Sequence, residues 1–214
     1  SNCTFTGNSG GAGGGMANYN NSNPTLSNCT FTGNSGGAGG GMYNNNSNPT
    51  LTNCTFIGNS ADGGGGMCNW ESNPTLSGCS FIGNWADFGG GGIYSYLSSP
   101  IIANCTISEN IAAASFGHGG GGLAYFRGSP TMTNCVISGN RSSWLGGGVC
   151  YYLLGTGVPS GGISITGCII TGNKAKEAGG GIFCSGYITK IANCTVAGNA
   201  PVPDLRKLTL FCAG

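Results

Sequence analysis

The amino-acid sequence predicts an all-β fold, a right-handed, single-stranded parallel β-helix (solenoid) of about eight coils with ~25 residues in each. Three observations lead to this prediction. The chain repeats itself, with near-copies at residues 22–42, 47–67 and 72–93. Three short sequence motifs, here called marks, recur in the same order along the chain. The segments lack the 3.6-residue apolar period and the good helix formers that a helical repeat needs.

The three marks define the repeat. The first is a cysteine, at Cys3, Cys29, Cys54, Cys79, Cys105, Cys135, Cys168 and Cys194. The second is an apolar residue with an asparagine three positions later: Phe5/Asn8, Phe31/Asn34, Phe56/Asn59, Phe81/Asn84, Ile107/Asn110, Ile137/Asn140, Ile170/Asn173 and Val196/Asn199. The third is a glycine run that ends in Met16, Met42, Met67, Ile93, Leu123, Val149 or Ile182.

Short alternating segments predict the strands of one coil. Residues 54–56 are expected to alternate inward and outward, as in a strand. Residues 49–51 are a second strand, which begins with a proline at a position where its missing N–H removes no hydrogen bond between strands. Residues 66–70 form a third segment. Three short strands and three corners are therefore expected in each coil.

Stacking of equivalent positions, at a spacing of about 4.8 Å, explains why residue types repeat. Leu26, Leu51, Leu76 and Ile102 are expected to stack inside the coil, beside the cysteines and the Phe5-to-Val196 series. The asparagines of the second mark are expected to form a hydrogen-bonded ladder. A second asparagine ladder is expected from Asn28, Asn53, Asn104, Asn134 and Asn193.

Composition limits the classes of partner. Charged residues make up 6% of the chain and the formal net charge is +1, so clustered Lys and Arg for phosphate binding are not expected and nucleic acid is excluded as a partner. No apolar run of 18 residues occurs, so direct membrane insertion is not expected.

The domain organisation follows from the repeat. Residues 1–200 form one β-helix array, with insertions near residues 111–118 and 153–162 that are expected to be surface loops. Residues 201–214 leave the pattern and are expected to be a C-terminal tail or a cap over the last coil.

The glycine run paired with the Phe-x-x-Asn segment resembles the GGA-[ILV]/FxxN repeat of chlamydial polymorphic outer membrane proteins. It is also similar to the right-handed parallel β-helix repeats of large bacterial surface proteins. The motifs cover residues 1–200, nearly the whole chain, and the resemblance implies secretion, display at the cell surface, and structural or adhesive roles.

The twelve cysteines are expected to be mostly packing residues. The eight repeat cysteines are predicted to be a reduced, buried ladder, because in-register neighbours lie farther apart than a disulfide requires. Cys68 and Cys150 are expected to point outward as exposed thiols, and a Cys184–Cys212 disulfide is an alternative for the remaining pair.

Acidic residues offer little for catalysis. Asp62 and Asp87 occupy one position in adjacent coils, so they are either solvated corner residues or, as the alternative, a carboxylate pair or weak calcium site. No side chain that could act as a general base, and no arginine that could hold a substrate, occupies the matching coil position. Neither an enzyme nor a cofactor is therefore expected.

Aromatic residues recur three positions after the glycine-run mark, and this row is the candidate ligand-binding surface. Its aromatic members are Tyr19, Trp70, Tyr96, Phe126 and Tyr152. If the mark points inward, this row points outward and forms an exposed stripe, which serves either an interaction surface or stability through stacking.

The sequence thus predicts a non-catalytic extracellular or cell-surface module with a structural or adhesive role. Self-association end to end into filaments and binding of polysaccharide are the expected partnerships. The alternative function is a carbohydrate-binding or polysaccharide-degrading β-helix.

Overall fold

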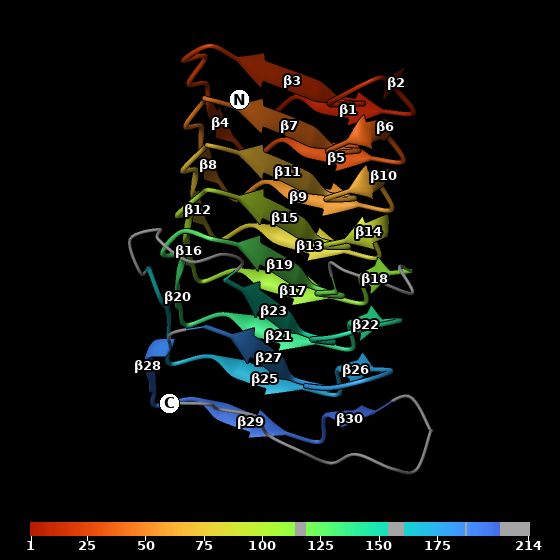
Figure 1. The fold of residues 1–214 in the computed structure, drawn as a ribbon. Coiled ribbons are helices and arrows are strands. Elements are labelled where there is room, and N and C mark those ends of the chain that lie inside the picture. The colour runs from red at the N-terminus through yellow and green to blue at the C-terminus, as the bar shows by residue number, and fades with distance from the viewer. Residues whose placement is uncertain (114–118, 154–160, 187, 202–214) are drawn as a thin grey trace.

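In a computed structural model the chain forms a parallel β-solenoid (Figure 1). The structure describes residues 1–113, 119–153, 161–186 and 188–201. In this part, four parallel sheets run along the solenoid, and each coil contributes one strand to each sheet. Two sheets have eight strands and two have seven, which gives seven complete coils and the first two strands of an eighth.

Sheets A to D are named in the order in which the chain enters them. Sheet A comprises β1 (Thr4–Thr6), β5 (Thr30–Thr32), β9 (Thr55–Ile57), β13 (Ser80–Ile82), β17 (Thr106–Ser108), β21 (Val136–Ser138), β25 (Ile169–Thr171) and β29 (Thr195–Ala197). Sheet B comprises β2 (Ser9–Gly10), β6 (Ser35–Ala38), β10 (Ser60–Gly63), β14 (Trp85–Gly89), β18 (Ile111–Ala112), β22 (Arg141–Ser142), β26 (Lys174–Ala175) and β30 (Ala200–Pro201). Sheet C comprises β3 (Met16–Tyr19), β7 (Met42–Asn45), β11 (Met67–Trp70), β15 (Ile93–Tyr96), β19 (Leu123–Phe126), β23 (Val149–Tyr152) and β27 (Ile182–Ser185). Sheet D comprises β4 (Thr25–Ser27), β8 (Thr50–Thr52), β12 (Thr75–Ser77), β16 (Ile101–Ala103), β20 (Thr131–Thr133), β24 (Ile163–Thr166) and β28 (Ile188–Ala192).

The coil has four strands, so the expectation of three was wrong. Sheet B is the strand series that the sequence pattern did not show. In the first coils its residues are Ser, Gly and Ala, which have low intrinsic strand preference. These segments become strands because backbone hydrogen bonds to the coils above and below hold them in register.

The phenylalanines of the second mark stack inside the solenoid, as predicted. The ring centroids of Phe5, Phe31, Phe56 and Phe81 lie 4.4, 4.6 and 4.6 Å apart, and the rings are parallel within 2°. Strand pairing is in register along this series. The stack continues with buried isoleucines in later coils, so one internal position is apolar through the length of the array.

The leucine and cysteine rows complete the core. Leu51, Leu76 and Ile102 have no exposed surface, and Leu26 is buried too. The repeat cysteines from Cys29 to Cys168 are also buried, and within the described residues none of the eight repeat cysteines forms a disulfide. The inward orientation of the ladder is therefore found from Cys29 to Cys168, whereas Cys3 is exposed and Cys194 is half-buried at the two ends; the reduced state of the thiols stays a prediction. Cys212 lies outside the described residues, so the alternative Cys184–Cys212 disulfide stays untested.

Glycine runs are required where coils approach closely. A Cβ atom on Gly41 would lie 2.6 Å from the carbonyl oxygen of Gly66 in the next coil and 2.7 Å from a ring carbon of Phe56. Only a residue without a side chain fits between two backbones at this distance. This contact places the glycine mark beside the phenylalanine stack in successive coils.

The asparagines of the second mark form a continuous buried ladder. The Asn34 side-chain amide donates to Oδ1 of Asn59 at 2.9 Å, and the Asn59 amide donates to Oδ1 of Asn84 at 2.9 Å. Backbone N–H groups join the same oxygens, as from Asn34 to Asn59 at 3.0 Å. The pattern extends from Asn8 to Asn199, so every buried amide has partners in both neighbouring coils.

The second expected asparagine ladder is not formed. Asn28, Asn53, Asn104, Asn134 and Asn193 are exposed, and among the described residues no hydrogen bond joins their side chains to one another. Their φ angles lie between 52° and 55°, which is the left-handed region. Gly78 and Gly167 take this position in the two other coils, with φ of 63° and 65°. Asparagine is used here because it tolerates left-handed backbone at a corner.

The insertions and the tail fall largely outside the described residues. Residues 114–118 and 154–160, within the two predicted insertions, are not described. Of the predicted tail or cap, only Pro201 is described, as the end of β30. These expectations stay predictions.

Candidate functional site

The predicted aromatic stripe lies on the outer face of sheet C, and its members differ in exposure. Tyr19 and Trp70 are 45% and 40% exposed, whereas Tyr96 and Tyr152 are half-buried. Phe126 is only 2% exposed, so its expected place on an exposed surface was wrong. The accessible part of the stripe is therefore concentrated on the N-terminal coils.

A second hydrophobic cluster explains why Phe126 is buried. Phe126 packs with Cys68, Tyr94 and Ala124 outside the main core, and its ring centroid lies 5.5 Å from that of Tyr94 and 5.9 Å from that of Tyr152. In β11, β19 and β23 the two outward residues of sheet C are a small residue and a large ring, as in Ala124 and Phe126, whereas β15 has two rings, Tyr94 and Tyr96. A large ring can therefore cover the small neighbour.

Cys68 and Cys150 belong to the small outward positions, and both are buried. The expectation of exposed thiols was wrong, because an outward-facing strand position is not exposed when aromatic rings cover it. Desolvation raises the pKa of Cys68 to about 12. Burial raises the pKa of the Cys150 thiol as well.

Trp70 and Tyr96 form the best-defined exposed aromatic pair. They are register partners in β11 and β15, and their rings stack with centroids 4.3 Å apart and an interplanar angle of 28°. On the other side of Trp70, the register partner is Asn45 in β7, a shorter and polar side chain. The indole face that does not contact Tyr96 is therefore directed over Asn45.

Asn45 is itself held in place. Its side-chain amide donates to the hydroxyl of Tyr43 at 3.1 Å, and its Oδ1 accepts from the amide of Asn46 at 2.7 Å. Tyr19, the next residue of the row, packs edge to face on Tyr43 with centroids 5.5 Å apart. One polar position thus lies between two exposed aromatic residues, Tyr19 and Trp70.

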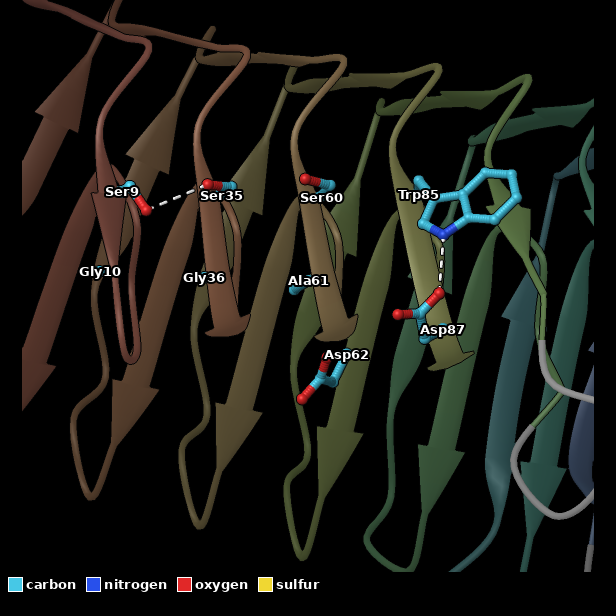
Figure 2. A pocket seen from close by; sticks show the side chains of 9 residues that line it. All are labelled: Ser9, Gly10, Ser35, Gly36, Ser60, Ala61, Asp62, Trp85 and Asp87. Carbon is cyan, nitrogen blue, oxygen red and sulfur yellow. Dashed lines mark hydrogen bonds between the residues drawn. The ribbon is translucent and has the colours of Figure 1, made fainter.

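A shallow groove of about 420 Å³ lies on sheet B, away from the aromatic stripe (Figure 2). Ser9, Ser35 and Ser60 form a row along it, and Trp85 stands at the end of that row. The Trp85 indole N–H donates to a carboxylate oxygen of Asp87 at 3.0 Å, which fixes the ring on the surface. Trp85 was not among the expected site residues, and the signal in the sequence was its replacement of a serine at this coil position.

Asp62 and Asp87 lie on adjacent strands of the groove, as their spacing predicted. A β-bulge separates them, because β14 has one more residue than β10 at this point. Among the described residues, no group of three His, Cys, Asp or Glu side chains is placed to hold a metal ion. Calcium requires six to eight oxygen ligands, so this geometry adds no support to the calcium alternative.

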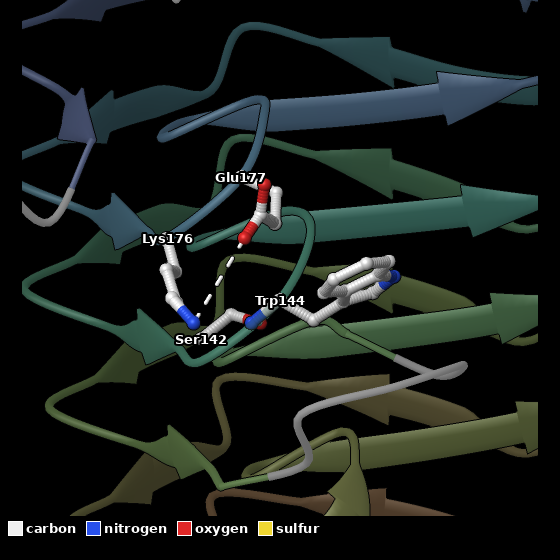
Figure 3. Close-up of polar contacts among 4 residues, drawn as sticks. All are labelled: Ser142, Trp144, Lys176 and Glu177. Atoms are coloured by element: carbon white, nitrogen blue, oxygen red, sulfur yellow. Dashed lines mark hydrogen bonds and ion pairs between the residues drawn. The ribbon is translucent and has the colours of Figure 1, made fainter. Parts of the chain in front are cut away.

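Basic residues occupy the same face of sheet B further along the solenoid, and Figure 3 shows one of them, Lys176, beside Glu177. Arg141 and Lys174 are register partners in β22 and β26, and both are exposed. Lys176 forms an exposed ion pair with Glu177 at 4.0 Å. Such exposed pairs contribute little to stability, so Lys176 remains available to a stronger partner.

Comparison with known families agrees with this geometry. The right-handed β-helix region matches residues 1–158, which is most of the chain. The chain belongs to the right-handed β-helix family. A second match, to the Chlamydia polymorphic membrane protein repeat, covers residues 167–185 of this β-helix.

No curated protein and no solved structure gives a significant match to this β-helix chain. Within the described residues, no helix has the length and apolar character needed to cross a membrane. The resemblance to a right-handed parallel β-helix and to the chlamydial repeat is confirmed.

Proposed function

We propose that this β-helix is a non-catalytic, surface-displayed adhesive module that binds extended polysaccharides through Trp70 and its neighbours on sheet C. The observation that carries the proposal is the exposed Trp70 indole, held by stacking on Tyr96 at 4.3 Å. Sugar rings present apolar C–H faces that pack on aromatic rings. A fixed ring loses little conformational freedom when it binds.

Polar groups beside the ring supply the second requirement of a sugar site. The Asn45 side chain and the exposed Asn46 lie next to Trp70, within the same corner region of neighbouring coils. Amide groups donate to and accept from sugar hydroxyls. A neutral ligand also suits the low charge of the chain, whose formal net charge is +1.

The match of residues 167–185 to the chlamydial repeat supports display at a cell surface. The carboxylates Asp62 and Asp87 lie on sheet B, on a different face from Trp70. Glu71 follows Trp70 directly, so among the described residues one carboxylate lies beside the ring. Hydrolysis of a sugar bound at Trp70 would need a pair of carboxylates there, and this favours binding over cleavage. End-to-end self-association stays a prediction.

A glycan array followed by titration calorimetry tests the proposal. The double substitution Trp70→Ala and Tyr96→Ala is expected to weaken binding at least about tenfold, with an unchanged circular dichroism spectrum. Trp85→Ala is the matched control, because it removes a tryptophan of similar exposure from another sheet. Absence of any glycan bound by the unchanged protein, or unfolding of the double variant, would show that the stripe is structural.

A further inference from the structure

Sheet A is the most regular face of the solenoid. Its eight strands, β1 to β29, lie one above the other in Figure 1, and their pairing continues from coil to coil without a register shift. Sheets B and D each contain such a shift. Two residues join sheet D to sheet A, and two join sheet A to sheet B, in every coil, so both insertions fall at other corners. Seven intervals of about 4.8 Å give a continuous face about 34 Å long.

The outward residues of sheet A are uncharged and mostly carry hydroxyl groups. Each strand has one inward residue between two outward ones, so the sheet has a first and a second outward row. Of the sixteen outward residues, eight are Thr, three are Ser, and the other five are Ile, Val or Ala. The first row begins with an unbroken series of hydroxyl side chains in register: Thr4, Thr30, Thr55, Ser80 and Thr106.

These side chains are rigid, and their hydroxyls are open to water. Thr and Ile are branched at Cβ, which restricts χ1, and each packs beside its equivalent one coil away. Among the described residues, no Thr or Ser hydroxyl on sheet A hydrogen-bonds to another protein group, whereas on sheet B the Ser35 hydroxyl donates to Ser9 at 3.3 Å. Ile57 in the second row is 40% exposed. The face therefore presents hydroxyl and methyl groups to solvent at fixed positions.

We propose that the outer face of sheet A binds ice. Equivalent residues lie about 4.8 Å apart along the solenoid, and the two outward residues of one strand lie about 6.6 Å apart. The oxygen lattice on the prism face of hexagonal ice repeats at two perpendicular distances close to these. Water molecules held by the two rows therefore lie near lattice positions, and they join the crystal while they stay hydrogen-bonded to the protein.

A crystal is the ligand that suits so regular a face. Each hydroxyl or methyl contact contributes little, so binding requires many contacts at once, and a repeated array meets a repeated lattice at each position. The face also lacks ammonium groups, which are strongly hydrated and hold water around their charge. Sheet D is less suitable, because Ile101 and Ala103 interrupt its hydroxyl rows and β28 carries the exposed Lys190.

The N-terminal coils are the centre of the proposed site. Val136 and Ile169 follow Thr106 in the first row, so the unbroken hydroxyl series extends from β1 to β17. Thr55 in β9 lies in the middle of that series. The site is on a different sheet from Trp70, so it does not depend on the proposed glycan site.

Nanolitre osmometry and partition into growing ice test the proposal on the whole chain. The unchanged protein is expected to open a gap between the melting and freezing temperatures, to shape the crystals, and to become enriched in the ice fraction. Thr55→Lys puts a strongly hydrated ammonium in the middle of the hydroxyl series and holds the face away from the lattice, so the temperature gap and the enrichment should fall at least about fivefold. Thr106→Lys is a second variant in the same row, with the same expected loss.

Thr50→Lys is the matched control. Thr50 is an exposed outward residue of sheet D, in the strand directly before β9, so the same substitution leaves sheet A unchanged. Its effect on both measurements should stay within about twofold, and circular dichroism and urea unfolding verify the fold of all three variants.

An unchanged protein that neither separates the two temperatures nor enters the ice at any concentration would overturn the proposal. Full activity of folded Thr55→Lys and Thr106→Lys would also overturn it, as would an equal loss in Thr50→Lys. The glycan test concerns sheet C, so failure of one proposal is distinguishable from failure of the other.

Discussion

Replacing Asn59 with alanine tests whether the buried asparagine ladder holds the coils together. Oδ1 of Asn59 accepts two hydrogen bonds from Asn34, one from its backbone N–H at 3.0 Å and one from its side chain at 2.9 Å. The Asn59 side-chain amide donates to Oδ1 of Asn84 at 2.9 Å and to the carbonyl of Phe31 at 3.0 Å. Asn59 has no exposed surface, so water cannot replace these partners.

The cost follows from the groups that lose their partner. The backbone N–H of Asn34 and one N–H of its side chain are left without acceptors in a buried site. Each such group costs about 1–3 kcal/mol, so Asn59→Ala is expected to lower the free energy of unfolding by about 2–6 kcal/mol. Native domains are stable by only about 5–15 kcal/mol, so the loss should be easy to measure.

Urea unfolding followed by circular dichroism is the assay, and amide exchange at Asn34 reports on local opening of its coil. Asn53→Gly is the matched control in the same coil. Asn53 is exposed with a φ of 52°, and glycine already takes this corner at Gly78, so the change should be within about 0.5 kcal/mol. A loss below about 1 kcal/mol for Asn59→Ala, or no larger than the control, would refute this account of the ladder.

Two other predictions concern buried tyrosine hydroxyls and buried cysteine thiols. The hydroxyl of Tyr125 is buried and, among the described residues, has no hydrogen-bond partner, so Tyr125→Phe should raise the free energy of unfolding by about 1 kcal/mol or more. Tyr151, its register partner in the next coil, has one hydroxyl proton and two carbonyl oxygens within reach of it, those of Gly161 at 2.7 Å and Gly128 at 3.0 Å. Tyr151→Phe should therefore lower the free energy of unfolding in the same urea experiment, and equal effects of the two changes would contradict this reasoning. Cys68 and Cys150 should react with a maleimide at least about 100-fold more slowly in the native protein at pH 8 than in urea, because both are buried and the pKa of Cys68 is raised to about 12. Mass spectrometry of labelled peptides measures both rates, and rapid native labelling would show that sheet C does not cover them.

The inward half of each coil could be predicted residue by residue. The same residue type recurs once per coil at the positions of Phe56, Cys54 and Leu51. A side chain at such a position packs on the same type of side chain in the next coil, so its inward orientation follows from the repeat. The outward half could not be predicted so well. Cys68 and Phe126 alternate correctly as outward positions, yet both are buried, because their exposure depends on rings that neighbouring coils supply.

The sequence by itself determined the solenoid, its period, the inward rows and the asparagine ladder from Asn8 to Asn199, because in-register stacking brings each residue onto its own equivalent. The tertiary structure alone decided the rest. Sheet B exists because hydrogen bonds between coils hold glycine- and serine-rich segments as strands, which local strand preference does not favour. Only that sheet brings Asp62, Trp85, Arg141 and Lys176, separated by up to 114 positions in the chain, onto one face. The acidic residue Asp62 comes before the basic residues Arg141 and Lys176 in the order of the coils, and the regular spacing of strands converts that order into a face that is acidic at β10 and β14 and basic at β22 and β26.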